Sequence, residues 1–196
     1  MLSSYRKFRY PDQRKTLMLP RPTLEAFDAW LASRSLQLEA IVVGGSALAL
    51  LGVTERQTRD VDILDPELSA EIALAAREFA GYQRNQGVEL ADDWLNNGPI
   101  QLTEVLPADW RLRVRSVFDG ASLRLTILGR ADLLKTKLFA LCDRGTDLAD
   151  CLALAPDAEE LAEAEPWLTA QDAHPLWPEH ARSTLADLGR RLGHAL

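Results

Sequence analysis

Two aspartates separated by a single residue are the side chains of this sequence most suited to chemistry. Asp60 and Asp62 lie in the run D-V-D-I-L, in which apolar residues alternate with the acids as in a short strand. On a strand the two carboxylates project to the same side, about 6.5–7 Å apart. Paired carboxylate oxygens suit Mg²⁺, which keeps water and substrate phosphates in its other coordination positions. The pair therefore predicts a site for two Mg²⁺ ions that organises phosphoryl transfer, with a solvated strand edge as the alternative.

A Gly-Gly-Ser sequence precedes the two aspartates, between an expected strand at residues 40–43 and an expected helix at residues 47–51. Gly44 and Gly45 allow the backbone to approach a triphosphate, and Ser46 opens a helix whose first amides attract anions. Taken alone, the glycines would suit an ordinary strand-to-helix turn equally well, and neither G-x-G-x-x-G nor G-x-x-x-x-G-K-[ST] occurs. Two arginines just before the first aspartate are placed to contact a phosphate or a base. The residues of this region that we expect to bind nucleotide are Gly44, Gly45, Ser46, Arg56 and Arg59.

The composition is that of one folded domain without a membrane partner. The 196 residues are 47% hydrophobic and carry a net charge of -7. A chain of this size buries about 70% of its surface and needs no structural metal or disulfide. The longest uncharged stretch, residues 40–54, is too short to span a membrane, and the basic N-terminus lacks the apolar segment of a secretory signal. Cys142 and Cys151 suit buried thiols in a reducing compartment, so we expect a cytoplasmic protein.

Charge is distributed unevenly along the chain. Residues 1–21 carry six bases and one acid, residues 22–110 five bases and fifteen acids, and residues 111–144 eight bases and three acids. Residues 147–172 hold eight acids and no base. A protein that coats nucleic acid would not show this pattern, whereas a carboxylate metal site beside a basic, phosphate-binding segment would. Solvated charged faces are the plainer alternative.

The elements that must position these residues follow from hydrophobic periodicity. Ser69 is a good N-cap for one of the helices, and Asp119-Gly120 is a good hairpin turn for the last two strands. The expected helices cover residues 23–31, 69–79, 131–143, 147–155, 157–165 and 179–192. The expected strands cover residues 40–43, 61–64, 100–106, 111–118 and 122–128.

The order of these motifs resembles the polymerase-β-type nucleotidyltransferase superfamily. The resemblance is carried by G-G-S, a short helix and then R-x-T-R-D-V-D-I-L at residues 56–64. It is closest to the small bacterial branch that includes abortive-infection toxins and minimal nucleotidyltransferase antitoxins. Residues 132–150 are similar to the downstream signature of that branch, a K-x-x-A helix followed by R-x-x-D-x-x-D, and residues 93–97 to a D-W-L-N-D stretch in an uncharacterised subgroup. The resemblance spans about residues 38–155.

The resemblance implies both a fold and an activity. The implied fold is α+β, a small mixed β-sheet flanked by helices, with a basic arm at residues 1–22, a nucleotidyltransferase core at residues 23–145 and a C-terminal helical extension at residues 146–196 packed with the core. The implied activity is Mg²⁺-dependent transfer of a nucleoside monophosphate from a nucleoside triphosphate to an RNA end or a protein side chain, in a toxin–antitoxin or phage-defence setting. A non-catalytic nucleotide-binding or toxin-neutralising protein on the same fold is the rival interpretation.

Enzymes of the superfamily place a third carboxylate on a later strand. Glu104 is the best strand-borne candidate here, with Asp92 and Asp93 behind it. Asn97 stands where the subgroup often has an acid. Trp94, in the same loop, is expected to be a core residue or to stack on a base.

Lys137 lies within the apolar stripe of the helix at residues 131–143. A lysine there must extend to solvent or pair, and its functional partner would be a phosphate or the Asp60–Asp62 site. Lys135 is more simply explained by a pair with Asp132. Arg144 holds either a neighbouring acid or a phosphate. The expected catalytic residues are therefore Asp60, Asp62, Lys137 and Glu104, and Arg144 joins the nucleotide-binding set.

Overall fold

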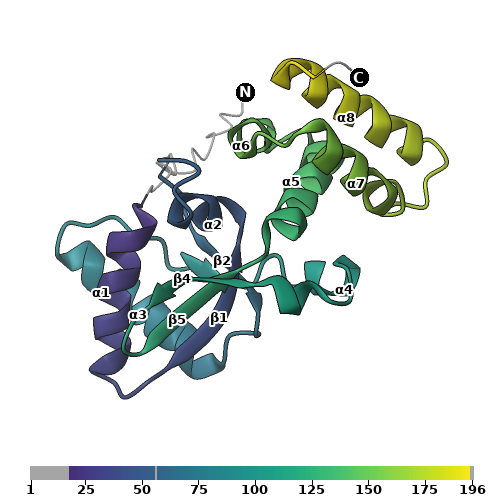
Figure 1. Ribbon diagram of the computed structural model, residues 1–196. Helices are drawn as coiled ribbons and strands as arrows, with labels where there is room; N and C mark the ends of the chain where they lie inside the picture. Colours follow the sequence, from purple (N-terminus) through teal and green to yellow (C-terminus); the bar gives the residue numbers. More distant parts are fainter. Residues whose placement is uncertain (1–17, 56, 195–196) are drawn as a thin grey trace, which may run out of the picture.

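A five-stranded mixed sheet forms the centre of the computed structural model, which describes residues 18–55 and 57–194 (Figure 1). The strand order is β3-β2-β1-β5-β4. β1 runs parallel to β5 and antiparallel to β2, while β3 is parallel to β2 and β4 antiparallel to β5. The strands are β1 (Leu38–Val43), β2 (Val61–Asp65), β3 (Leu95–Asn96), β4 (Arg115–Asp119) and β5 (Leu123–Ile127).

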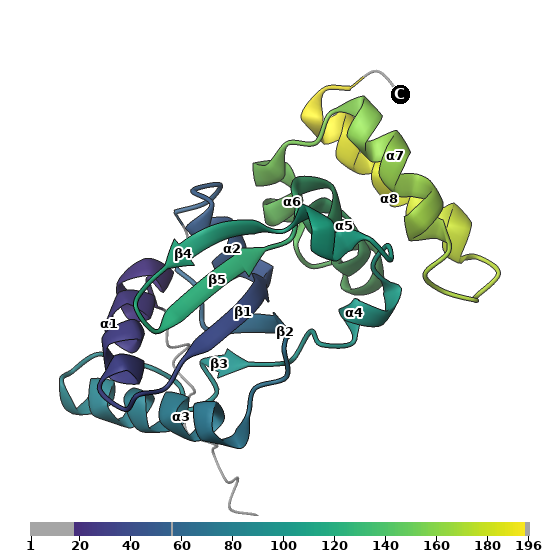
Figure 2. The same ribbon diagram turned by 60° about the horizontal axis from the view of Figure 1, so that its bottom comes forward.

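Helices surround this sheet in two groups. Figures 1 and 2 show α1 and α3 along the sheet, α5–α8 gathered beyond one end of it, and α4 between the two parts. α6, α7 and α8 all pack against α5 or against one another. The helices are α1 (Pro20–Ala32), α2 (Gly44–Leu50), α3 (Ala70–Asn85), α4 (Leu102–Val105), α5 (Arg130–Arg144), α6 (Leu148–Leu154), α7 (Ala158–Thr169) and α8 (Trp177–Leu192), with a 3-10 turn at Trp110–Arg113.

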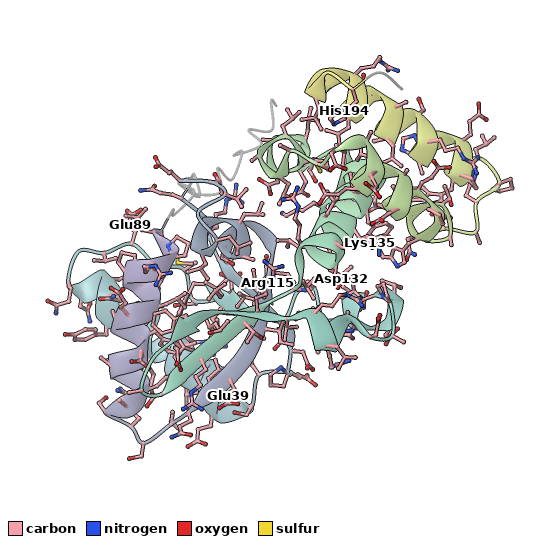
Figure 3. All side chains as sticks on the ribbon, in the orientation of Figure 1. Glu39, Glu89, Arg115, Asp132, Lys135 and His194 are labelled. Atoms are coloured by element: carbon pink, nitrogen blue, oxygen red, sulfur yellow. The ribbon has the colours of Figure 1, made fainter. Side chains whose placement is uncertain are left out.

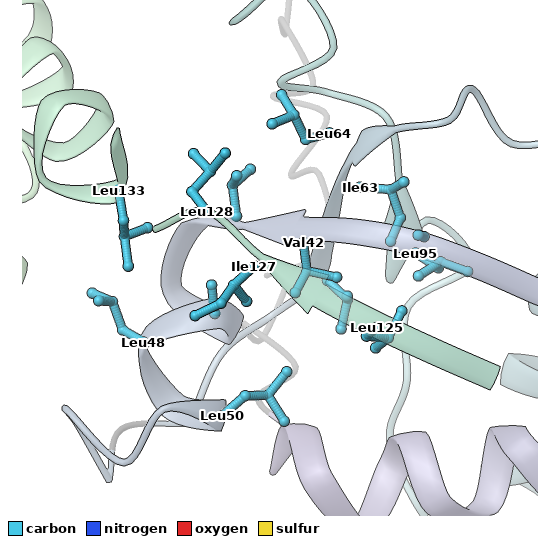
Figure 4. Close-up of a cluster of buried hydrophobic side chains, with 14 of the residues drawn as sticks. Val42, Leu48, Leu50, Ile63, Leu64, Leu95, Leu125, Ile127, Leu128 and Leu133 are labelled. Atoms are coloured by element: carbon cyan, nitrogen blue, oxygen red, sulfur yellow. The ribbon is translucent and has the colours of Figure 1, made fainter. Parts of the chain in front are cut away.

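The hydrophobic core joins the sheet to the helices that carry the site. Figure 4 shows buried side chains from β1, β2 and β5 meeting Leu48 of α2 and Leu133 of α5. Full burial of each such side chain contributes about 1.5–3 kcal/mol. This packing fixes the ends of β1 and β2 relative to α5.

An aromatic cluster closes the core between α1, α3 and the sheet. The rings of Phe27, Phe79 and Trp94 lie 5.0–5.6 Å apart, centroid to centroid. Trp94 is fully buried, and its Nε1 donates to the carbonyl of Ala76 at 3.0 Å. It is a core residue, and the alternative of stacking on a base is wrong because the ring is inaccessible.

The α+β architecture with its C-terminal helices is confirmed, as are the β4–β5 hairpin and the main helices. α1 begins at Pro20 instead of residue 23, because prolines suit the first turn of a helix. The Ser69 cap accepts a hydrogen bond from the amide of Ile72, and α3 runs on to Asn85. The division of the chain at residue 145 stays a prediction, and most of the basic arm lies outside the described residues.

One expected strand is wrong, and the strand expected at residues 111–118 begins only at Arg115, because residues 110–113 form the 3-10 turn. Residues 100–106 contain the short helix α4, in which Thr103 Oγ1 donates to the carbonyl of Ile100 and the indole of Trp167 donates to the carbonyl of Val105. These bonds satisfy the backbone locally and from α7, so the segment has no need of a neighbouring strand. None of the helices in the described ranges has the length and apolar character needed to cross a membrane.

Candidate active site

A cleft of about 680 Å³ opens where the end of the sheet meets α4, α5 and α6. This volume lies in the range of small-molecule binding sites. Five of the residues expected to act in chemistry or binding line it, namely Gly44, Gly45, Asp62, Lys137 and Arg144. The other lining residues are Val43, Gly98, Pro99, Gln101, Leu102, Val105, Thr136, Phe139, Ala140, Asp143, Asp147, Asp150 and Gln171.

Asp62 projects from β2 into this cleft, whereas Asp60 lies just before the strand and is not among the residues that line the cleft. Burial and the nearby charge of Asp60 raise the pKa of Asp62 to about 6, against the lowering effect of Asn96, Lys137 and Arg144. Burial also raises the pKa of Asp60. Two interacting carboxylates that are partly removed from water form a site that favours a cation.

Gly44 brings the Gly-Gly-Ser turn against this carboxylate. Its φ of +73° lies in the left-handed region, where a side chain is strained. A Cβ atom built on Gly44 would also overlap Asp62 Oδ2. Two independent requirements for glycine therefore coincide at the point where the two sequence motifs meet.

Ser46 is buried, and its hydroxyl donates to the carbonyl of Val43 at 3.2 Å. This bond stabilises the β1–α2 turn, and Ser46 is not among the residues that line the cleft. Arg59 is exposed and lowers the pKa of Asp60, which places it near the acidic pair. Arg56 lies outside the described residues.

Lys137 is buried on the α5 wall of the cleft and pairs with two aspartates. Its Nζ lies 2.9 Å from Asp147 Oδ1 and 2.7 Å from Asp150 Oδ2. Burial lowers the pKa of Lys137, but the hydrogen bonds and charges of both aspartates outweigh this, so the net shift is upward and the ammonium stays charged. The expected direct pair with the Asp60–Asp62 site is therefore replaced by this triad, although Lys137 is close enough to lower the pKa of Asp62.

Arg144 occupies the end of α5 at the cleft. Its Nη2 lies 3.6 Å from Asp147 Oδ2, and its side chain is 63% exposed. It also lowers the pKa of Asp62 through its charge. Arg144 thus contacts an acid and remains accessible to a ligand in the cleft.

Asp132 is fully buried and forms a two-bond pair with Arg113, whose Nε and Nη2 lie 2.7 and 2.9 Å from its carboxylate oxygens. The expected pair between Lys135 and Asp132 is therefore wrong. Figure 3 labels both residues on α5. Arg113 anchors the segment before β4 to this helix.

The expected third carboxylate does not reach the cleft. Glu104 is exposed on α4, and it is not a lining residue. Asp92 pairs with Arg84 at 2.6 Å. Asp93 is exposed and acts on Asp60 only through its charge.

Asn96 instead lies beside Asp62, since the two residues are partners in the parallel pairing of β2 and β3. Its side chain forms a hydrogen bond that lowers the pKa of Asp62. The adjacent Asn97 has a structural role: its amide donates to the carbonyls of Ile63 and Pro66 and accepts from the amide of Leu68. Sequence reasoning drew attention to Asn97 and missed Asn96, although both stand in the D-W-L-N-N stretch.

Gln171, after α7, is another lining residue that sequence reasoning missed. Its Nε2 donates to the carbonyl of Trp167 at 2.8 Å. No local pattern marks it, because only the packing of α7 beside α5 brings it to the cleft.

Comparison with known proteins gives a family and one solved structure. A family model described as "Nucleotidyltransferase of unknown function (DUF6036)" matches residues 23–155. A crystal structure of an antigenic nucleotidyltransferase-like protein from Paracoccidioides brasiliensis is similar, with 15% identity, 88% of each chain covered and a TM-score of 0.47. The search of curated proteins returned no match.

Proposed function

Because this chain belongs to the family of nucleotidyltransferases that matches residues 23–155, we propose that it transfers a nucleoside monophosphate from a nucleoside triphosphate to a hydroxyl acceptor. The observation that carries the proposal is the meeting of Gly44 and Asp62 at the cleft. The backbone of Gly44, which has no side chain, lies directly against the partly buried carboxylate of Asp62. This arrangement leaves room for a polyphosphate that a cation links to the carboxylate.

The donor set fits Mg²⁺. Asp60 and Asp62 offer carboxylate oxygens, and burial of both makes their negative charge costly without a cation. Mg²⁺ bound here would neutralise charge on the triphosphate. The residues that would hold it are Asp60 and Asp62.

The remaining cleft residues bind and orient the nucleotide. The backbone of Gly44 and Gly45 faces the phosphates, and the charges of Lys137 and Arg144 offset theirs. The acceptor oxygen forms a bond to the α-phosphorus while the bond from that phosphorus to the β-phosphate oxygen breaks. Pyrophosphate leaves with the electron pair, and the proton of the acceptor passes to solvent.

We propose that the acceptor is an RNA end or a protein side chain, and that the protein acts in a toxin–antitoxin or phage-defence system. The support is the resemblance of residues 56–64 and 132–150 to the small bacterial nucleotidyltransferases. The triad of Lys137, Asp147 and Asp150 gives the second of these motifs a physical role, because its aspartates hold the lysine at the cleft.

The test is transfer of radiolabel from each α-³²P-labelled nucleoside triphosphate, with Mg²⁺ and either cellular RNA or lysate protein as acceptor. We expect labelled acceptor with the wild-type protein and none with Asp62→Asn. Asp65→Asn is the matched control, because Asp65 lies on the same strand but pairs with Arg111 at 3.4 Å, away from the cleft. Label transfer by Asp62→Asn at the wild-type rate would refute the proposal.

A non-catalytic nucleotide-binding or toxin-neutralising protein is the second candidate. It is favoured by Asn96, which puts a neutral amide beside Asp62 where a further carboxylate would strengthen metal binding. Tight binding of a nucleotide or of a partner protein, without transfer of label to any acceptor, would support this candidate over the enzyme.

A further inference from the structure

Four aspartates line the cleft, Asp62, Asp143, Asp147 and Asp150, but Asp147 and Asp150 are already paired with Lys137, which leaves few acidic groups for two metal ions. Among residues 18–55 and 57–194, no group of three or more His, Cys, Asp or Glu side chains is arranged to hold a metal. Two-metal sites for phosphoryl transfer keep their ions about 3.5–4 Å apart, and carboxylates must offset the repulsion between them. Asp60 and Asp62 supply two negative charges, which balance one divalent cation.

Asn96, on β3, lies beside Asp62, and its side chain is held by hydrogen bonds. Its Oδ1 accepts from the amide of Gly98 at 2.7 Å, so the acceptor end of the side chain faces the backbone. The other end is an NH₂ group, which donates to the carbonyl of Asp93 at 3.4 Å and has a second proton that can be donated to a carboxylate. The hydrogen bond between Asn96 and Asp62 therefore presents a donor to the acidic pair, and a donor does not ligate a metal.

Two side chains of α5 that line the cleft supply positive charge. Lys137 and Arg144 both act on Asp62 through their charges. Lys137 is held by Asp147 and Asp150, whereas the ion pair of Arg144 within the described part of the chain is a longer one, at 3.6 Å to Asp147. A guanidinium is suited to phosphate because its N–H groups form paired hydrogen bonds with two oxygens.

We propose that the cleft takes one divalent cation together with the triphosphate, and that Arg144 provides at the phosphates the positive charge that a second cation would otherwise supply. Asn96 is the residue that limits the site to one ion. The inference rests on the proposed nucleotide-binding function, and it replaces the expectation of two Mg²⁺ ions with one ion and one arginine.

The experiment counts bound metal rather than activity. The protein is saturated with an equimolar mixture of the α,β-methylene analogues of ATP, GTP, CTP and UTP, which cannot release pyrophosphate, and Mn²⁺ is titrated with detection of the free ion by electron paramagnetic resonance. We expect one protein-bound Mn²⁺ per bound nucleotide in the wild type and two in Asn96→Asp. Asn85→Asp, at the exposed end of α3, adds the same charge away from the cleft and is expected to bind one.

The arginine is tested by analogue affinity. Arg144→Ala is expected to bind the analogues roughly 10- to 100-fold more weakly, since hydrogen bonds to charged groups are among the stronger ones. Arg124→Ala is the matched control, because its side chain is 62% exposed and pairs with Glu39 and Asp119 on the sheet, outside the cleft. Its affinity is expected to be that of the wild type.

The possible results distinguish failure of the one-ion inference from failure of the proposed nucleotide-binding function. Two bound Mn²⁺ ions per nucleotide in the wild type would overturn the inference and leave nucleotide binding intact, and this count does not depend on any variant folding. An Asn96→Asp protein that folds and still binds one ion would overturn the role of Asn96. Unchanged affinity in Arg144→Ala would overturn the role of the arginine. Absence of any analogue binding would overturn the proposed function, and the inference with it.

Discussion

The Asp62→Asn variant is expected to fold more stably than the wild type at neutral and alkaline pH in the absence of metal. The pKa of Asp62 is raised from 3.8 to about 6, first by burial and then by Asp60. Between these two values the folded protein binds more protons than the unfolded chain, so the free energy of unfolding falls as the pH rises through this window. Above pH 6 the Asp62 carboxylate is charged in the folded protein, and its ionisation lowers the free energy of unfolding by the full amount. A difference of about two pKa units corresponds to up to about 3 kcal/mol. Asparagine carries no such cost.

The assay is urea unfolding followed by circular dichroism at several pH values, with EDTA present. We expect Asp62→Asn to exceed the wild type by up to about 3 kcal/mol at pH 8, and the gap to close towards pH 4. Added Mg²⁺ with nucleotide is expected to stabilise the wild type and leave the variant unchanged, because only the former binds the ligand. Asp65→Asn, which removes an exposed pair with Arg111, is expected to lose less than about 1 kcal/mol. Equal stability of Asp62→Asn and wild type at both pH values would refute the reasoning.

Three further substitutions test other parts of the site. Gly44→Ala is expected to lose label transfer and nucleotide affinity, because its methyl group displaces the Asp62 carboxylate. Gly52 has a similar φ of +72° but open space around it, so Gly52→Ala is expected to lower the free energy of unfolding by only about 1–2 kcal/mol. Lys137→Met leaves two aspartates without their cation and is expected to lower the free energy of unfolding in urea by about 3–5 kcal/mol. Lys135→Met, the control, is expected to lower it by about 0.5 kcal/mol or less. Equal losses in the two variants would contradict the triad. Trp94→Phe removes a buried hydrogen bond and is expected to lower the free energy of unfolding by about 1–3 kcal/mol without changing nucleotide affinity. Weaker nucleotide binding by a folded Trp94→Phe protein would show that the ring takes part in binding.

Local patterns predict the two elements that meet at the candidate site. The β1–α2 junction is marked by an apolar run that ends in glycine, and β2 by aspartates that alternate with apolar residues. Both signals depend on backbone preferences within a few residues, so the sequence alone predicts the turn and the strand. It does not predict that Gly44 touches Asp62, which follows from the antiparallel pairing of β1 with β2.

Long-range packing decided the parts that sequence reasoning missed. Asn96 lies beside Asp62 because β3 pairs with β2, and a two-residue strand has too little pattern to reveal that pairing. The partners of Lys137 come from the next helix, and the partner of Asp132 from the segment before β4. Opposite charges were available to each of them at several positions, so only the tertiary structure selects the pair.

The same limit explains the error at α4. The residues from Ile100 to Leu106 contain alternating apolar side chains, which fit a strand, but residues 102–105 form a helical turn that packs against β2. The hydrogen bond from Trp167 to the carbonyl of Val105 ties it to α7. Glu104 is therefore exposed on α4 and does not line the cleft.

The most direct measurement of the central claim compares labels at the two ends of the triphosphate. Wild-type protein is incubated with Mg²⁺, acceptor and a nucleoside triphosphate labelled with ³²P at either the α- or the γ-phosphate, and released pyrophosphate is counted. We expect only the α-label to reach the acceptor, with one pyrophosphate released for each transfer, and we expect EDTA or Asp62→Asn to abolish both. Transfer of the γ-label, or α-label transfer that persists in Asp62→Asn, would contradict the central claim.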